Sequence, residues 1–140
     1  MKKKQFKVPK LDLKDKVSLY SISSSESDIR ICYIINQVVG INLSLTEDII
    51  VRVKSSQQAF KNYYYESEHG TEKYYLIINR NNYNYLIPEL KKVDYLFLCV
   101  SETIITNLEL FIKQIKAYPE ISAVIKIDPA EIKSFNRIKF

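Results

Sequence analysis

The sequence predicts an α+β fold: a mixed, mostly antiparallel sheet of five or six strands, with two main helices packed on one face. Three observations lead to this prediction. Two segments have apolar residues at helical spacing, several shorter segments alternate or run apolar as strands do, and polar turns separate the strands. The sheet is expected to be mixed because one predicted hairpin is antiparallel and one predicted crossover is parallel.

The chain begins with a basic segment, residues 1–16, in which short stretches alternate between apolar and polar residues. We interpret it as an N-terminal arm or an edge strand, and residues 17–140 as a single α+β domain. The segment has seven lysines and two aspartates, so it accounts for the whole net charge of +5. Lysines on an edge strand discourage pairing with other chains. Residues 17–22 could extend this strand or form a short link.

The first helix is predicted over about residues 27–39. Ser27 and Asp28 offer side chains that can cap its N-terminus. Its apolar residues recur at helical spacing: Ile31, Ile34, Ile35 and Val38. Gly40 is well placed to end the helix, because glycine readily adopts the left-handed conformation found there.

The middle of the chain is predicted to form strands. Residues 49–53 alternate between apolar and polar side chains, as in a half-buried strand. Residues 58–66 and 72–79 are predicted to form a hairpin, because the intervening residues 67–71 are polar and include a glycine. A further extended run, residues 83–87, stops at a proline.

The C-terminal part of the chain predicts a strand–helix–strand unit. Residues 93–100 form a continuous apolar run, which is typical of a central strand. A helix is predicted over about residues 102–117, capped by Ser101, and a last strand over residues 121–127. These elements could form a right-handed βαβ crossover. An Asp-Pro pair directly after the last strand predicts a short final turn of helix.

The sequence offers few residues for a catalytic or metal centre. The one histidine, His69, lies in a predicted exposed turn, without histidine or cysteine neighbours. Cys32 and Cys99 lie within apolar patterns, which favours buried free thiols in a reducing compartment. The chain has no Walker-type or dinucleotide-binding glycine pattern. We therefore expect no enzymatic activity, no metal and no cofactor.

The sequence also predicts a cytoplasmic protein without a membrane partner. The lysines at the start of the chain are not followed by the apolar stretch of a signal peptide. No run approaches the roughly 18 apolar residues that a membrane span requires.

Tyrosine is unusually common, with 11 residues, and five tyrosines lie in the predicted hairpin: Tyr63, Tyr64, Tyr65, Tyr74 and Tyr75. Successive residues of a strand face opposite sides, so this hairpin should present aromatic surface on both faces. Packing against the core, or self-association, is the favoured interpretation. Base stacking on RNA is the alternative, because aromatic sheet faces can stack bases.

One short motif resembles a known family. Every named position of the string IPExxxVDY is matched at Ile87-Pro88-Glu89-Leu90-Lys91-Lys92-Val93-Asp94-Tyr95. The string gives its name to the IPExxxVDY proteins, a bacterial family of unknown function, and residues 30–37 also look like the first helix of that family. The resemblance implies a bacterial, intracellular, stand-alone protein, but it implies no particular activity.

The same motif can be interpreted physically. Pro88 turns the chain out of an extended segment, and Glu89 would lie in the first turn of a short helix, where a carboxylate is favoured. Asp94 and Tyr95 stand at the entrance to the apolar strand. The four residues could form a loop-to-strand junction held by hydrogen bonds. Alternatively, they form a polar patch that binds a partner, or Glu89 and Asp94 form a catalytic dyad.

These observations favour a non-enzymatic protein-interaction or adaptor protein. The partner would be an unidentified protein or a second copy, bound through the tyrosine-rich sheet or an edge strand. The alternative is an RNA-associated protein that binds phosphates through the lysines of its arm. That electrostatic arm would comprise Lys2, Lys3, Lys4, Lys7 and Lys10.

Overall fold

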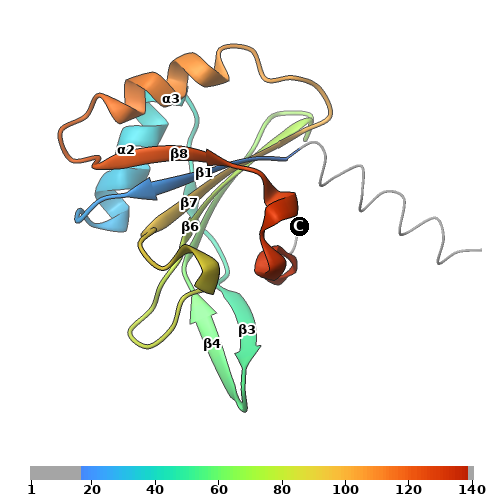
Figure 1. Ribbon diagram of the computed structural model, residues 1–140. Helices are drawn as coiled ribbons and strands as arrows, with labels where there is room; N and C mark the ends of the chain where they lie inside the picture. The colour runs from blue at the N-terminus through green and yellow to red at the C-terminus, as the bar shows by residue number, and fades with distance from the viewer. Residues whose placement is uncertain (1–16, 139–140) are drawn as a thin grey trace, which may run out of the picture.

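The computed structural model describes residues 17–138, so the basic arm lies outside the described residues. The described residues form a six-stranded sheet, two α-helices and a separate two-stranded sheet (Figure 1). In chain order the strands and helices are β1 (Val17–Ser23), α2 (Asp28–Val39), β2 (Ser44–Leu45), β3 (Ile49–Val53), β4 (Ser56–Phe60), β5 (Asn62–Glu66), β6 (Glu72–Ile78), β7 (Tyr95–Ser101), α3 (Leu108–Lys116) and β8 (Ala123–Ile127). Three short 3-10 helices are η1 (Pro88–Leu90), η2 (Pro129–Glu131) and η3 (Lys133–Arg137).

The predicted α+β fold with two main helices is confirmed. The large sheet has the strand order β2-β5-β6-β7-β1-β8, and every neighbouring pair in it is antiparallel. The predicted crossover from β7 through α3 to β8 does connect two parallel strands, since both are antiparallel to β1. They are not neighbours, however, because β1 lies between them, and this makes the sheet antiparallel throughout.

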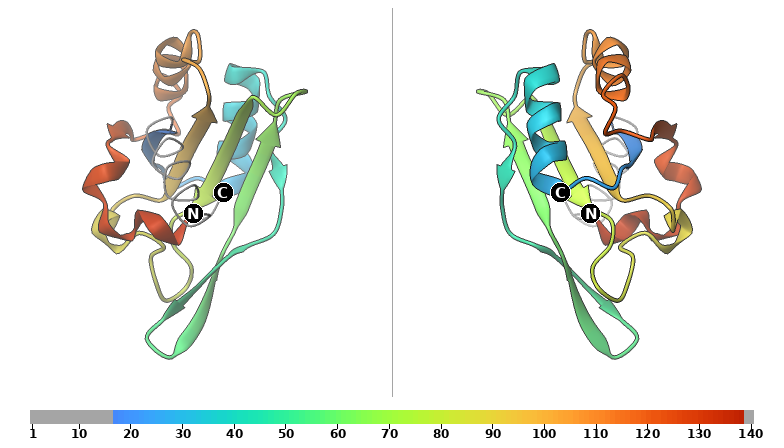
Figure 2. Two further views of the ribbon diagram at one scale, coloured as in Figure 1. Left: turned by 90° about the vertical axis from the view of Figure 1, so that its right-hand side faces the viewer. Right: turned by 90° about the vertical axis from the view of Figure 1, so that its left-hand side faces the viewer.

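Both faces of the large sheet are covered. On one face, α2 and α3 pack over a core that includes Tyr20, Leu76 and Phe97. On the other face, the C-terminal segment, the loop before β7 and the β3–β4 hairpin cover a second core, which includes Leu98 and Ile77. Figure 1 shows α3 at the top, α2 at the left, and the β3–β4 hairpin projecting at the bottom. The side views of Figure 2 show the same projection.

Helix α2 forms where its end signals predict it. The Ser27 Oγ accepts a hydrogen bond from the backbone N–H of Arg30, at 3.3 Å, which caps the N-terminus. Gly40 adopts a left-handed φ of 78° and donates its N–H to the carbonyl of Asn36. Ile31, Ile34 and Ile35 are buried against the sheet.

Helix α3 is shorter than predicted. It begins at Leu108 rather than at residue 102, because Asn107 has a left-handed φ of 69°, which breaks the helical path. Asparagine tolerates this conformation better than most residues. Ser101 remains in β7, and its Oγ accepts a hydrogen bond from the Thr103 N–H at 3.2 Å without starting a helix there.

Two predicted strands differ from the structure. The segment 58–66 is broken at Lys61 into β4 and β5, because β4 pairs with β3 while β5 pairs with β6 in the large sheet. The extended run 83–87 forms no strand and has only an isolated bridge between Arg80 and Tyr85. The short final turn predicted after β8 is present as η2, with the Asp128 carboxylate capping it.

Candidate functional site

The IPExxxVDY motif forms a short helical turn and the entrance to β7. Ile87 is extended, as expected for a residue before proline, and Pro88 begins the 3-10 turn η1. Leu90 and Val93 follow, and Tyr95 is the first residue of β7. The motif therefore connects the loop below the sheet to the central strand.

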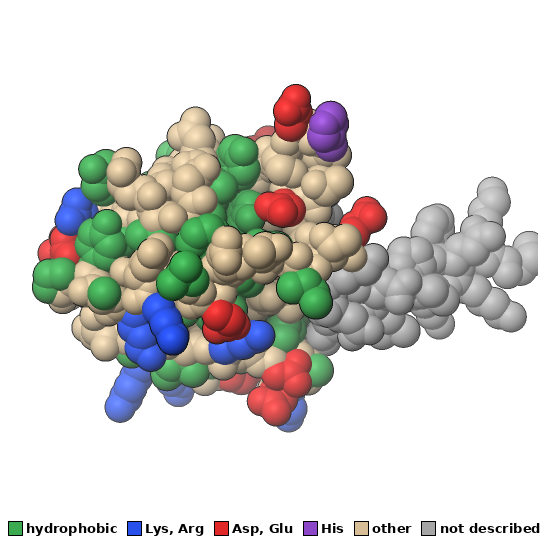
Figure 3. Space-filling model, turned by 90° about the horizontal axis from the view of Figure 1, so that it is seen from above, with side chains coloured by type: hydrophobic (Ala, Val, Ile, Leu, Met, Phe, Trp, Pro, Cys, Tyr) green, Lys and Arg blue, Asp and Glu red, His purple; other side chains and the backbone are tan. Residues whose placement is uncertain are grey.

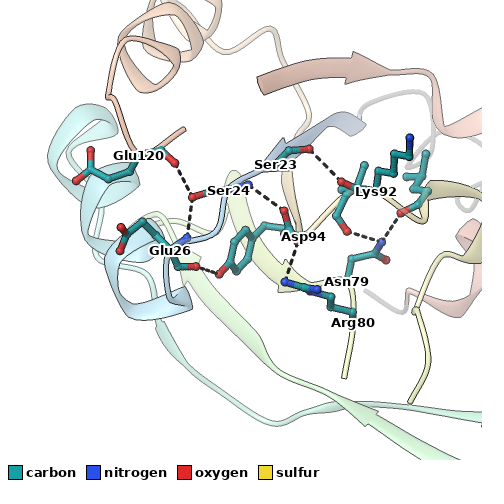
Figure 4. A network of polar contacts seen from close by, with 11 residues as sticks. Ser23, Ser24, Glu26, Asn79, Arg80, Lys92, Asp94 and Glu120 are labelled. Atoms are coloured by element: carbon teal, nitrogen blue, oxygen red, sulfur yellow. Dashed lines mark hydrogen bonds and ion pairs between the residues drawn. The ribbon is translucent and has the colours of Figure 1, made fainter. Parts of the chain in front are cut away.

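Asn79, directly after β6, fastens this loop to the sheet. Its side chain is completely buried. The amide Nδ2 donates to the carbonyls of Leu90 and Val93, at 2.9 and 3.0 Å, and the Oδ1 accepts from the Ile87 N–H at 2.9 Å. Figure 4 shows Asn79 beside Arg80 within this polar network. Nothing in the sequence distinguishes Asn79 from a turn residue, because asparagine is common before and within polar turns.

Asp94 connects the motif to the turn between β1 and α2. Its Oδ2 accepts from the backbone N–H of Ser24 at 2.9 Å, and its Oδ1 lies 3.0 Å from Nη2 of Arg80. Ser24 is buried, and its Oγ donates to the carbonyl of Glu120 at 2.6 Å. Asp94 thus accepts a hydrogen bond from the backbone N–H of the buried residue Ser24, which directly follows β1 (Figure 4).

Tyr95 reaches the same turn from the other side. The Tyr95 hydroxyl donates a hydrogen bond to the carbonyl of Glu26. Burial raises the pKa of Tyr95 to about 12, and the carboxylates of Asp28 and Asp94 add to the rise. The phenol therefore stays protonated at neutral pH and acts as a donor.

Glu89 contacts a different part of the molecule. Its Oε2 accepts from the backbone N–H of Ser134, at 3.0 Å, at the start of η3. The structure therefore joins Asp94 and Tyr95 through the β1–α2 turn and engages Glu89 with the C-terminal segment. In this arrangement Glu89, Asp94 and Tyr95 hold neighbouring elements together, whereas Pro88 begins the turn η1.

The Glu89 contact predicts a change in the acid dependence of stability. Burial opposes the charge, but hydrogen bonds from the N–H groups of Glu89 and Ser134 outweigh it and lower the pKa below the usual 4.5. The ionised group therefore stabilises the fold above about pH 4.5, and this stabilisation is lost as the pH falls through the folded-state pKa. We expect Glu89→Gln to cost less than about 0.5 kcal/mol at pH 7, because the exposed side chain is screened by solvent. Urea unfolding between pH 3 and 7 should show a shallower acid decline, whereas an unchanged profile would contradict the assignment.

The tyrosine-rich hairpin lies mostly inside the molecule. Tyr63, Tyr74 and Tyr75 are each at most 8% exposed, and Tyr74 stacks on Phe97 with ring centroids 6.2 Å apart. Tyr63 and Tyr74 belong to the core under the helices, whereas Tyr75 belongs to the core on the opposite face. These rings offer little surface for base stacking or for a partner.

A groove lies where β7 leads into α3, and the sequence analysis did not predict it. Its volume is about 820 Å³, and the loop before α3 lines it together with Ser18, Cys99 and Lys126. Glu109 at its side accepts from the Tyr20 hydroxyl at 3.0 Å and lies 3.7 Å from the Lys126 Nζ. The view from above in Figure 3 shows acidic, basic and hydrophobic side chains interspersed on this side of the molecule.

Several features bear on chemistry and location. Among residues 17–138, no group of three or more His, Cys, Asp or Glu side chains is arranged to hold a metal ion. His69 is exposed in the turn between β5 and β6. Cys32 and Cys99 are buried free thiols. No helix in the described part of the chain is long and apolar enough to cross a membrane.

Four strands have only one neighbouring strand among the described residues: β2 and β8, which end the large sheet, and β3 and β4, which pair with each other. Strand β8 ends the large sheet and pairs only with β1, and strand β3 pairs only with β4. Exposed strand edges present backbone N–H and C=O groups that can pair with another chain.

No protein-family model matches the sequence, and no curated protein matches it.

Proposed function

We propose that this chain is a non-enzymatic protein-interaction protein that self-associates through a strand edge. The open edges of β3 and β8 are the main support, because an unpaired edge provides backbone hydrogen-bonding groups for a second chain. The burial of the tyrosines directs this proposal to an edge rather than to the tyrosine-rich face.

The polar residues of the motif support the same proposal. Asp94, Tyr95 and Glu89 each hydrogen-bond to backbone groups of neighbouring segments. Their geometry is that of a junction that holds the β1–α2 turn, the motif loop and the C-terminal segment together. Such residues would maintain the shape of an interaction surface instead of performing a reaction.

The resemblance to the IPExxxVDY proteins adds the cellular setting to the proposal. It rests on the full match of residues 87–95 to the family string. On that basis the protein would be a bacterial one that acts in the cytoplasm. It would bind no cofactor, and its partner would be a second copy or another cytoplasmic protein.

RNA association remains the alternative function. The observation that favours it is the location of the whole net charge of +5 in residues 1–16, which lie outside the described residues. Binding through such an arm depends on phosphate contacts and weakens steeply with salt.

Sedimentation velocity of the full chain over a concentration series tests the proposal. We expect a concentration-dependent dimer or larger assembly that persists after nuclease treatment and after deletion of residues 2–16. A chain that remains monomeric up to high micromolar concentration would refute self-association. Co-sedimenting RNA that disappears with nuclease, high salt or the deletion would favour the alternative.

A further inference from the structure

Neither outer edge of the β3–β4 hairpin pairs with another strand among the described residues, but only β4 has a neighbouring side chain bonded to its backbone. The hairpin projects from the body of the molecule (Figures 1 and 2). At β4, the Asn81 Nδ2 donates to the carbonyl of Ala59 at 3.2 Å and to the Gln58 side chain at 3.0 Å. Strand β3 pairs with no strand other than β4 within residues 17–138. A second chain could therefore approach β3.

The two faces of β3 differ in character. Val51 faces inward and is 8% exposed within the core, together with Phe60 of β4. Ile50 faces the other way and is 48% exposed, although it is a large aliphatic residue. Because strand side chains alternate, the exposed residue Arg52 shares the face of Ile50. The exposed Asp48 directly precedes β3, and it would join this face where pairing with a second strand extends β3 by one residue.

The charges beside Ile50 have no partner in the described chain. Neither Asp48 nor Arg52 takes part in an ion pair within residues 17–138. Four residues of extended chain separate them by about 13 Å, so they are too far apart to pair with each other. An exposed isoleucine between an acid and a base is a self-complementary pattern, since reversing the strand exchanges the two charges.

We propose that β3 pairs with β3 of a second copy, antiparallel about a two-fold axis at Ile50. This proposal rests on the proposed self-association and assigns its surface. Ile50 then lies opposite Ile50 of the partner subunit, and Asp48 lies opposite Arg52 of the partner subunit, twice by symmetry. The result is a four-stranded sheet in the order β4-β3-β3-β4. Because the hairpins project, the two bodies lie at opposite ends of this sheet.

The edge of β8 is a poorer match to a second copy. Antiparallel pairing about Ile125 would place Lys126 opposite Val124, without an acidic partner. Lys126 is already close to Glu109 of its own chain, at 3.7 Å. A lysine on an edge strand also discourages pairing. Helix α3 also packs against β8.

Charge reversal on β3 provides a sharp test. In the full chain, Asp48→Arg and Arg52→Asp each place like charges opposite one another at two positions of the dimer. We expect each variant to dimerise roughly tenfold to hundredfold more weakly than the wild type, measured by sedimentation equilibrium at low salt. High salt should reduce the difference, because these pairs are exposed.

Two rescue experiments separate pairing from nonspecific damage. The double variant Asp48→Arg/Arg52→Asp restores opposite charges and should return the dissociation constant to within about threefold of the wild type. An equimolar mixture of the two single variants should form a heterodimer with near wild-type affinity, because the basic edge of one faces the acidic edge of the other. Ile125→Lys on β8 is the control and should leave the dimer unchanged.

The outcomes distinguish this interface from the broader proposal. A wild-type chain that stays monomeric would overturn both. A dimer that Ile125→Lys dissociates and that the β3 variants leave intact would keep self-association and overturn the β3 interface. Loss of the dimer in the single variants without rescue by either the double variant or the mixture would also overturn the proposed register.

Discussion

Replacing Asn79 by alanine is expected to lower the free energy of unfolding by about 3–4 kcal/mol. The substitution removes three hydrogen bonds of a completely buried side chain, to Leu90, Val93 and Ile87. The Leu90 carbonyl still accepts from the Val93 N–H, but the Val93 carbonyl and the Ile87 N–H lose their Asn79 partner, and each unsatisfied buried group costs about 1–3 kcal/mol. Chemical denaturation monitored by circular dichroism measures the loss.

A matched control is available in the next turn of the same loop. Asn82 is exposed, so Asn82→Ala should change the free energy of unfolding by no more than about 0.5 kcal/mol. Asn79→Asp has nearly the same shape but replaces the donor amide by an acceptor that faces two carbonyl oxygens. It should therefore be at least as damaging as Asn79→Ala. Equal stability of the Asn79 and Asn82 variants would show that the motif loop holds its position without Asn79.

Local signals predicted the fold well where the structure depends on local contacts. Helix α2 begins and ends at Ser27 and Gly40 because capping is decided by the residues at the ends themselves. The start of α3 could not be predicted in this way. The segment before Leu108 has a capping serine and apolar residues at helical spacing, yet Asn107 is left-handed and Ile104 is 95% exposed. The local sequence there favours a helix, but the left-handed backbone at Asn107 starts the helix only at Leu108.

The tyrosine-rich hairpin shows a different limit of prediction. Alternation correctly predicted aromatic residues on both faces of the hairpin, since Tyr63 packs in one core and Tyr64 packs against the other. Whether each face was free or covered depended on segments far away in sequence. The helices cover one face of the sheet. The C-terminal segment, which includes Phe135, covers the other face together with Phe60 of the β3–β4 hairpin. Long-range packing of this kind leaves no signal in the sequence of the tyrosine-rich hairpin itself.

The candidate site was predicted in part. Pro88 does begin a short helical turn, and Asp94 and Tyr95 do stand at the entrance to the central strand. Their partners, Ser24 and Glu26, are about 70 residues away in the chain, so sequence could not reveal them. The alternation of Ile50 and Arg52, directly after Asp48, is visible in the sequence, but alternation does not show whether a strand edge is paired. The sequence did not show that β3 pairs only with β4, which is what leaves the other edge of β3 open.

Asp94→Ala is expected to lower the free energy of unfolding by about 2 kcal/mol. The substitution removes two interactions, which contribute unequally to the free energy of unfolding. The Arg80 side chain is 54% exposed, so its ion pair with Asp94 contributes no more than about 0.5 kcal/mol. The larger part comes from the Ser24 N–H, which belongs to a residue only 4% exposed and would lose its acceptor.

Two further variants separate these contributions. Asp94→Asn keeps an oxygen that can accept from the Ser24 N–H and loses only the charge, so we expect a cost below about 1 kcal/mol. Arg80→Met removes the ion pair from the other side and should cost about 0.5 kcal/mol or less. If Asp94→Asn is instead as unstable as Asp94→Ala, the charge of Asp94 is the main contribution and the ion pair has been undervalued.

The same variants test what the motif does. If Asp94 is a junction residue, Asp94→Ala reduces stability, and self-association falls only to the extent that unfolded chains are lost. At a temperature where wild-type and variant chains are both folded, their dimerisation constants should then agree within about twofold, because β3 belongs to a different sheet from β7, which Asp94 directly precedes. A variant that keeps its stability and loses association would instead make Asp94 part of the binding surface. Asp94 and Tyr95 would then replace the β3 edge as the residues to vary first, since their contacts to the β1–α2 turn would be secondary to a partner.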